Sequence, residues 1–151
     1  MSLSRSTEIA ASPEVVWALV SDLPAMGRFS PENVGGSWKG GATGPAVGAR
    51  FTGRNRAGVR RWSTQVRVSR CEPGRAFAFD VSSFGLAVSR WSYDLEPTET
   101  GCRVTETWED RRGRLVTTGG RLLTGVADRE SHTAQGMERT LAAVKAVAES
   151  G

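Results

Sequence analysis

Two polar side chains stand on strand faces that are otherwise apolar, and they are the strongest candidates for chemistry. Glu106 alternates with Val104 and Trp108, so a strand would turn all three to the same side. A carboxyl group in an apolar cavity has a raised pKa and can act as a general acid or base near neutral pH. Tyr93 shares a face with Trp91 and could donate a hydrogen bond to a ligand carbonyl or a developing oxyanion. Glu106 and Tyr93 are therefore the candidate catalytic residues.

Each of these groups also has a structural interpretation. A carboxylate at an open end of a cavity would be solvated or paired with an arginine, and a core tyrosine would bond a backbone group. The same alternatives apply to Glu130, which falls on the stripe that Val126, Met137 and Leu141 form along a C-terminal helix. His132 falls almost opposite this stripe, so we expect it to face solvent rather than to act as a base.

The common catalytic and cofactor motifs are missing from the sequence. A single histidine leaves little material for a Ser-His-Asp or Cys-His arrangement, and no HExxH or Cys/His metal spacing occurs. No GxGxxG or Walker-type loop opens a helix after a strand. Cys71 and Cys102 stand apart without a CxxC, as expected of free thiols in a reducing compartment. We expect neither a metal ion nor a cofactor.

Aromatic side chains lie on the apolar faces of the central strands. Trp62, Trp91 and Trp108 would form flat walls for a planar ligand if the interior is hollow, or would simply pack if it is filled. The sequence does not decide between a hollow and a filled interior. On the hollow reading, the residues expected to line a ligand cavity are Trp62, Thr64, Phe77, Phe79, Trp91, Tyr93, Val104, Glu106, Trp108, Val126, Glu130, Met137 and Leu141.

The positive charge of the chain comes almost entirely from arginine. The formal net charge is +4, and Lys39 and Lys145 are the only lysines. Several arginines gather around one expected hairpin, at positions 54, 56, 60 and 61, with two more at 67 and 70. A solvated edge that discourages strand pairing is the default account, and contact with RNA or phosphate is the alternative. We do not favour nucleic acid as a partner.

The elements that must position these residues follow from alternation and capping signals. Ser12 is a good N-cap, Pro13 suits the first helical position, and Glu14 faces the positive end of the helix dipole. Turn residues are expected at 55–58 and 72–75. We expect helices over 12–21, 22–29 and from about 122 onward, an early strand carrying Trp38, and strands over 3–10, 49–54, 61–71, 76–81, 87–95 and 102–108.

This order resembles the polyketide cyclase/dehydrase branch of the START-like superfamily, also called SRPBCC, helix-grip or birch-pollen-allergen-like. The resemblance rests on the residues Ser-Pro-Glu-Val-Val-Trp at 12–17, the short helix ending near Phe29, the turn at 72–75 before Phe77, and the terminal helix over 136–145. It implies an α+β fold in which a curved seven-stranded antiparallel sheet wraps round a long C-terminal helix, with two short helices after the first strand. One ligand-binding domain would then span residues 1–151.

The family shares a cavity rather than a catalytic signature, so three functions stay open. The leading hypothesis is a protein that binds a hydrophobic, aromatic, polyketide-like or lipid-like small molecule. The first alternative is a cyclase or dehydrase that uses Glu106, and the second is a module that binds RNA or a partner through the arginine-rich hairpin. The sequence shows no signal peptide or membrane span. We expect a soluble, cytoplasmic monomer or homodimer.

Overall fold

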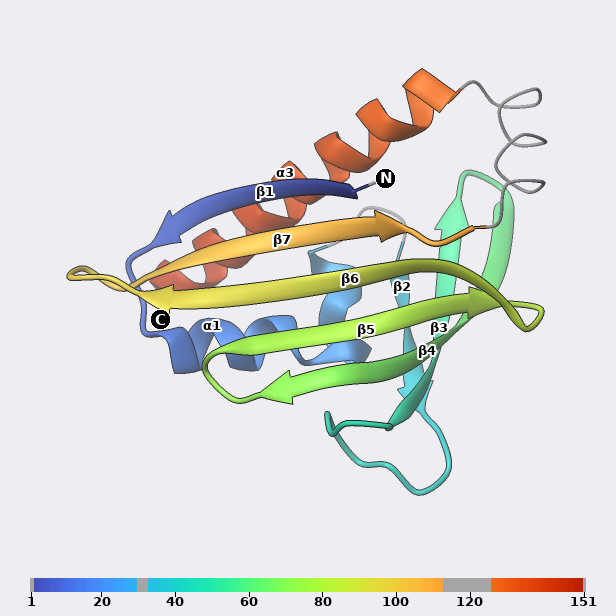
Figure 1. Cartoon of the computed structure of the whole chain (residues 1–151), viewed down its shortest axis with the longest axis horizontal. Helices are drawn as coiled ribbons and strands as arrows, with labels where there is room; N and C mark the ends of the chain where they lie inside the picture. Colours follow the sequence, from blue (N-terminus) through green and yellow to red (C-terminus); the bar gives the residue numbers. More distant parts are fainter. Residues whose placement is uncertain (1, 30–32, 113–125, 151) are drawn as a thin grey trace.

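A computed structural model describes residues 2–29, 33–112 and 126–150, which form a curved antiparallel sheet around a long helix (Figure 1). The sheet follows the order β1-β7-β6-β5-β4-β3-β2, so it is a meander in which only β1 leaves the chain order. The expected seven-stranded helix-grip fold is confirmed. Its strands are β1 (Ser2–Ile9), β2 (Asn33–Trp38), β3 (Arg50–Ala57), β4 (Arg60–Glu72), β5 (Ala76–Ser83), β6 (Leu86–Pro97) and β7 (Cys102–Asp110).

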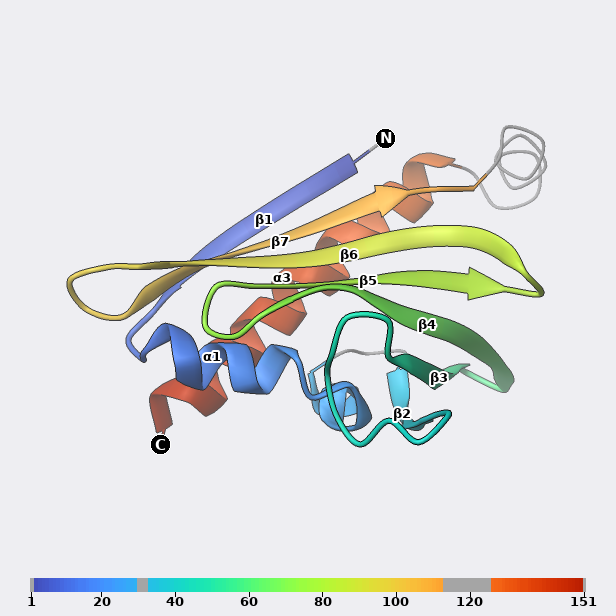
Figure 2. The same cartoon turned by 60° about the horizontal axis from the view of Figure 1, so that its bottom comes forward.

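Within these ranges three helices accompany the sheet: α1 (Pro13–Val20), the 3-10 helix η1 (Leu23–Arg28) and α3 (Val126–Ser150). The Ser12 hydroxyl accepts a hydrogen bond from the Val15 amide at 3.3 Å, as the capping signal predicts. Figure 2 shows α1 against the C-terminal half of α3, which it contacts together with β5 and β6. The expected start of α3 at about 122 lies outside the described residues.

The alternation predicted for the central strands is confirmed. The residues on the inner faces of β4 to β7 are those that the sequence pattern placed together, and most of them are buried. The expected turn at 55–58 is wrong, because β3 continues to Ala57 and the chain reverses at Gly58 and Val59. Gly58 has φ of 64°, which suits a tight two-residue reversal. This longer strand places Asn55 directly opposite Trp62.

One end of the interior is closed by α1. Val16 and Val20 are fully buried, and the Trp17 ring packs edge-on against Phe77 with 6.3 Å between centroids. The Trp17 indole N–H also donates to the Ala76 carbonyl at 2.9 Å, so it is satisfied within the core. Any hollow space must therefore lie toward the other end of the sheet.

At this closed end the β6–β7 turn lies very close to the chain that leaves β1. A Cβ atom built on Gly101 would overlap the Ile9 carbonyl oxygen and lie 2.7 Å from the Ala11 nitrogen. The C-terminal turns of α3 hold the same segment, because Lys145 donates to the Glu8 carbonyl at 2.7 Å. Only glycine fits between these backbone segments.

Two further expectations concern the cysteines and the membrane. Cys71 and Cys102 are free thiols, and burial raises the pKa of both. Over the described parts of the chain, no helix is both long enough and apolar enough to cross a membrane.

Candidate functional site

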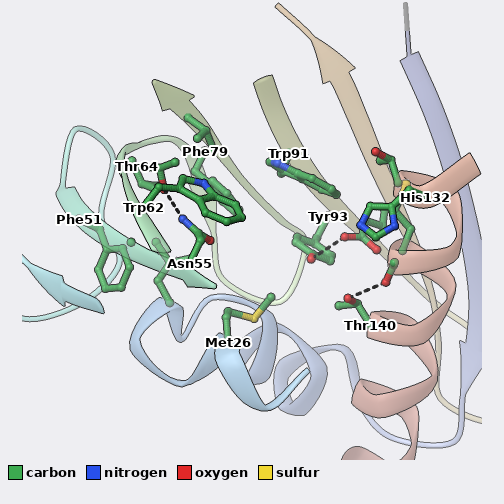
Figure 3. Close-up of a pocket in the computed structure, with 18 residues that line it drawn as sticks. Met26, Phe51, Asn55, Trp62, Thr64, Phe79, Trp91, Tyr93, His132 and Thr140 are labelled. Carbon is green, nitrogen blue, oxygen red and sulfur yellow. Dashed lines mark hydrogen bonds between the residues drawn. The ribbon is translucent and has the colours of Figure 1, made fainter. Parts of the chain in front are cut away.

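A cavity of about 260 Å³ lies between the sheet, η1 and the N-terminal half of α3. Figure 3 shows Trp62 and Phe79 toward one side of it and Tyr93, His132 and Thr140 toward the helix. Its walls are mainly apolar, with a few polar groups, which is the usual character of a small-molecule site. The lining residues are Leu23, Met26, Phe51, Gly53, Asn55, Trp62, Thr64, Val66, Phe79, Val81, Trp91, Tyr93, Glu106, His132, Thr133, Gly136, Met137 and Thr140.

The structure brings together seven of the residues expected in a cavity, on β4, β5, β6, β7 and α3: Trp62, Thr64, Phe79, Trp91, Tyr93, Glu106 and Met137. Four others face inward but do not line it, namely Phe77, Val104, Trp108 and Leu141, which are 0%, 0%, 7% and 3% exposed. For these four the expectation is wrong, because they pack into the core instead of bordering the hollow space. The side chains of Val126 and Glu130 lie outside the described part of the chain.

Sequence reasoning missed the floor of the cavity and most of its helix wall. Leu23 and Met26 come from η1, while Phe51, Gly53 and Asn55 come from β3. Their contribution depends on how η1 packs against β2, the neighbour of β3 in the sheet. Strand alternation does not predict that packing. Val66 on β4 and Val81 on β5 also line the cavity, on the same strand faces as Thr64 and Phe79.

Besides Met137 of the expected stripe, the helix wall is formed by small and polar residues. Thr133, Gly136 and Thr140 recur at spacings of three and four residues, which places them on one face of α3 beside Met137. The spacing of these residues in the sequence could have predicted this helix face. A search for apolar residues misses it, because none of the three is a large apolar residue. His132 is exposed, as expected, yet it also borders the cavity.

Gly136 leaves open space where any other residue would carry a side chain. A Cβ atom built on it meets no heavy atom within 4 Å, although the glycine lies in the middle of α3 and borders the cavity. The Thr140 hydroxyl donates back to the Gly136 carbonyl at 2.9 Å. Glycine inside a helix lowers stability relative to alanine, so this position gives up stability in exchange for volume.

The polar centre of the cavity is a pair of side chains on adjacent strands. Tyr93 and Glu106 are directly opposite each other in the β6–β7 register, and both point inward. The Tyr93 hydroxyl donates a hydrogen bond to Glu106 Oε2 at 2.8 Å (Figure 3). The hydroxyl that we expected to serve a ligand oxyanion is therefore bonded to Glu106. The second carboxyl oxygen, Oε1, has no hydrogen-bond partner within the described residues.

Burial decides the protonation of this pair. It raises the pKa of Glu106 to about 7, and the hydrogen bond from Tyr93 offsets only part of that rise. Burial, together with the negative charge of Glu106, also raises the pKa of Tyr93 well above its usual value. Tyr93 thus stays a hydrogen-bond donor at neutral pH while Glu106 exchanges its proton. This arrangement can hold or move one proton at the cavity wall.

A second polar contact lies across the cavity. Asn55 donates from its side-chain amide to the Thr64 hydroxyl at 3.3 Å, on strands that also carry Trp62. Trp62 is 40% exposed, so this part of the wall reaches solvent. The cavity therefore has a wet rim near β3 and β4 and a buried carboxyl group on β7.

No metal site is evident within the described ranges. No group of three or more histidine, cysteine, aspartate or glutamate side chains comes together there. The polar groups that line the cavity are a carboxyl group, a phenol, an imidazole, an amide and hydroxyl groups.

Comparison with solved structures supports the architecture. Cgl2372, a Polyketide_cyc-like protein from Corynebacterium glutamicum, is 33% identical, covers 97% of this chain and 90% of its own, and superposes with a TM-score of 0.70. The di-domain ARO/CYC StfQ from the steffimycin biosynthetic pathway reaches 0.78 at 11% identity, covering 99% of this chain and 50% of its own. Ara h 8.0201 reaches 0.73 at 11% identity, covering 100% and 99%. The last two show the fold alone.

The family comparison covers almost the whole sequence. No curated protein sequence matches the chain significantly. The profile of one family, described as "Polyketide cyclase / dehydrase and lipid transport", matches residues 1–149. Together with the cavity and the 33% identical structure, this match shows that the chain belongs to the polyketide cyclase/dehydrase and lipid transport family.

Proposed function

We propose that the protein binds a small, largely apolar, planar molecule in the cavity between the sheet, η1 and α3. The observation that carries this proposal is Glu106, which is 1% exposed and has one carboxyl oxygen without a partner among the described residues. A buried oxygen left without a hydrogen bond is costly. A ligand that carries a hydroxyl or another donor would satisfy it.

The size of the cavity limits the ligand. An apolar cavity of about 150 Å³ is enough to hold benzene. The cavity in this protein, at about 260 Å³, has room for roughly two fused rings with a substituent. Trp62, Phe79 and Trp91 supply flat surfaces against which such rings would pack.

Gly136 offers the sharpest test of binding. Gly136→Leu should fill the open space beside the helix and weaken binding of 2-naphthol by at least about tenfold, because a leucine side chain would occupy ligand volume. Quenching of tryptophan fluorescence during titration measures the affinity, since Trp62 and Trp91 border the cavity.

Gly136→Ala is the matched control. It should keep most of the affinity and stabilise the fold by about 0.5–1 kcal/mol, since alanine is the better helix former. If Gly136→Leu is folded and binds 2-naphthol as tightly as the parent, the ligand does not lie in this cavity.

A cyclase or dehydrase is the second candidate, favoured by the raised pKa of Glu106. A carboxyl group with a pKa of about 7 can both accept and return a proton at neutral pH. Tyr93 would orient it, since the hydroxyl holds Oε2 and leaves Oε1 for substrate.

In that case Glu106→Gln should reduce turnover of a poly-β-ketone thioester by at least about a hundredfold while leaving its binding nearly unchanged. Product formation by mass spectrometry, with binding measured in parallel, checks this expectation. Equal turnover by the glutamine variant and the parent would remove Glu106 as the acid/base and leave the binding function standing.

A further inference from the structure

Two neighbouring hairpin turns leave the same end of the sheet. The β3–β4 turn contains Gly58 and Val59, and the β5–β6 turn contains Phe84 and Gly85. Because β4 and β5 pair antiparallel, starting with Gln65 opposite Ser82, both turns lie at the same end of the sheet, and the β3–β4 hairpin extends beyond the end of β5. Figure 2 shows both turns at the right of the molecule, and in Figure 1 the β3–β4 turn points up while the β5–β6 turn points to the right.

The tips of these hairpins carry exposed apolar side chains. Val59 is 99% exposed, Phe84 101% and Leu86 61%. Phe84 also has φ of 52°, the one positive value at a non-glycine residue within the described ranges. A phenylalanine in this left-handed conformation is strained, and full exposure means that no packing offsets the strain. The two-residue turn between Ser83 and Leu86 itself requires a positive φ at position 84, but it does not require a phenylalanine, and local violations of this kind gather at functional sites.

Arginines flank the tip of the β3–β4 hairpin. Arg56 and Arg61 are directly opposite each other in the β3–β4 register, an arrangement that is unfavourable for like charges. Together with Arg54 and Arg60 they form no ion pair with an acidic group among the described residues.

Two carboxylates at this end of the sheet already have partners, and a third, Glu109, lies opposite Arg90 in the β6–β7 register. Asp80 accepts from Arg90 and Arg111, and Asp110 accepts from Arg112. The four hairpin arginines are thus left as an uncompensated cationic surface around apolar tips. We call this surface, made of residues 54, 56, 59–61, 84 and 86, the hairpin end.

We propose that the hairpin end docks on an anionic lipid bilayer. Val59, Phe84 and Leu86 would enter the interfacial region, and the arginines would lie at the level of the lipid phosphates. Two of the three apolar tip residues, Val59 and Leu86, favour acyl chains over nucleic acid, because they have no ring to stack on a base.

The position of the cavity adds to this inference. Trp62, which lines the cavity and is 40% exposed, follows Val59 by three residues on the same hairpin. A docked hairpin end would therefore bring the rim of the cavity to the membrane surface. Entry of a ligand from the bilayer rests on the proposed binding function, whereas docking itself does not.

Vesicle flotation tests the docking. The parent protein should float with vesicles of phosphatidylcholine and phosphatidylglycerol but not with vesicles of phosphatidylcholine alone, and salt should weaken the binding. The double variant Val59→Ser, Phe84→Gly should bind at least about tenfold more weakly, since it removes the apolar tips. Glycine accepts the backbone conformation at position 84, so folding is not at risk.

Matched controls come from the rest of the surface. Val47→Ser changes a 68% exposed valine in the loop between β2 and β3, and it should leave vesicle binding unchanged. Arg60→Gln with Arg61→Gln should weaken binding and flatten its salt dependence, whereas Arg75→Gln, in the β4–β5 turn at the opposite end, should not.

The proposal would be overturned by no binding to anionic vesicles, by equal binding of the tip variant, or by a dimer in light scattering that the tip variant abolishes. Binding of single-stranded RNA in place of vesicles would likewise contradict it. Gly136→Leu should still float with anionic vesicles, so a failure of the cavity proposal and a failure of the docking proposal give different results.

Discussion

Glu106→Gln is expected to remove most of the pH dependence of stability between about pH 5 and pH 9. In the parent, the folded state keeps the Glu106 proton up to a pH of about 7, while the unfolded chain releases it near the ordinary value of 4.5. Between these values the folded state binds more protons than the unfolded one. Stability therefore falls as the pH rises through this window and stays low above it.

The size of the effect follows from the shift. A rise in pKa from 4.5 to about 7 corresponds to a loss of roughly 3 kcal/mol once the carboxyl group is ionised. Glutamine stays neutral and can still accept the hydrogen bond from Tyr93. The variant should match the parent near pH 5 and exceed its stability by about 2–3 kcal/mol near pH 9.

Urea unfolding at a series of pH values measures this difference. Glu109→Gln is the control, because its side chain lies on the exposed face of the same strand and the substitution should leave the slope unchanged. A parent whose unfolding free energy is flat over this range would show that Glu106 is solvated rather than buried.

Gly101→Ala is expected to destabilise the fold by about 3 kcal/mol or more. The added methyl group would overlap the Ile9 carbonyl oxygen and press on the Ala11 backbone. Neither contact is the end of a flexible side chain, so the β6–β7 turn must separate from the chain that follows β1. Because Ile9 pairs with Cys102 and Lys145 holds Glu8, the disturbance reaches the sheet and α3 together.

Thermal and urea unfolding measure the loss, with a fall in Tm of about 10 °C expected. Gly44→Ala is the matched control, since a Cβ atom there meets nothing within 4 Å and the substitution should be nearly neutral. A Gly101→Ala protein within about 1 kcal/mol of the parent would contradict the close approach of these backbones.

The strand faces could be predicted because side chains alternate along a strand with a fixed period. Glu106 and Tyr93 were placed inward for this reason alone, and the register pairs them directly. Alternation predicts which face of the sheet a side chain occupies. It does not predict whether that side chain borders the cavity or packs at the closed end of the interior. Phe77 and Val104 therefore share faces with lining residues yet pack at the end that α1 closes.

The helix side of the site required three-dimensional information. Gly136 enlarges the cavity because it has no side chain, and a hydropathy pattern does not reveal the space that a missing side chain leaves. Thr133 and Thr140 line an apolar pocket although their side chains are polar. Asn55 was assigned to a turn, because asparagine followed closely by glycine usually marks one, and the strand instead continued past it.

The position of β1 in the sheet determines when its pairing can form during folding. β1 is made before the other strands of the sheet, yet its strand neighbour is β7, about one hundred residues further along the chain. During synthesis from the N-terminus, β1 must wait with both backbone edges unpaired until nearly all of the sheet has formed. Closing so long a loop makes this pairing a late and slow step in folding. The nascent chain therefore presents a free strand to its surroundings for most of its synthesis, which makes β1 the segment most in need of protection from aggregation.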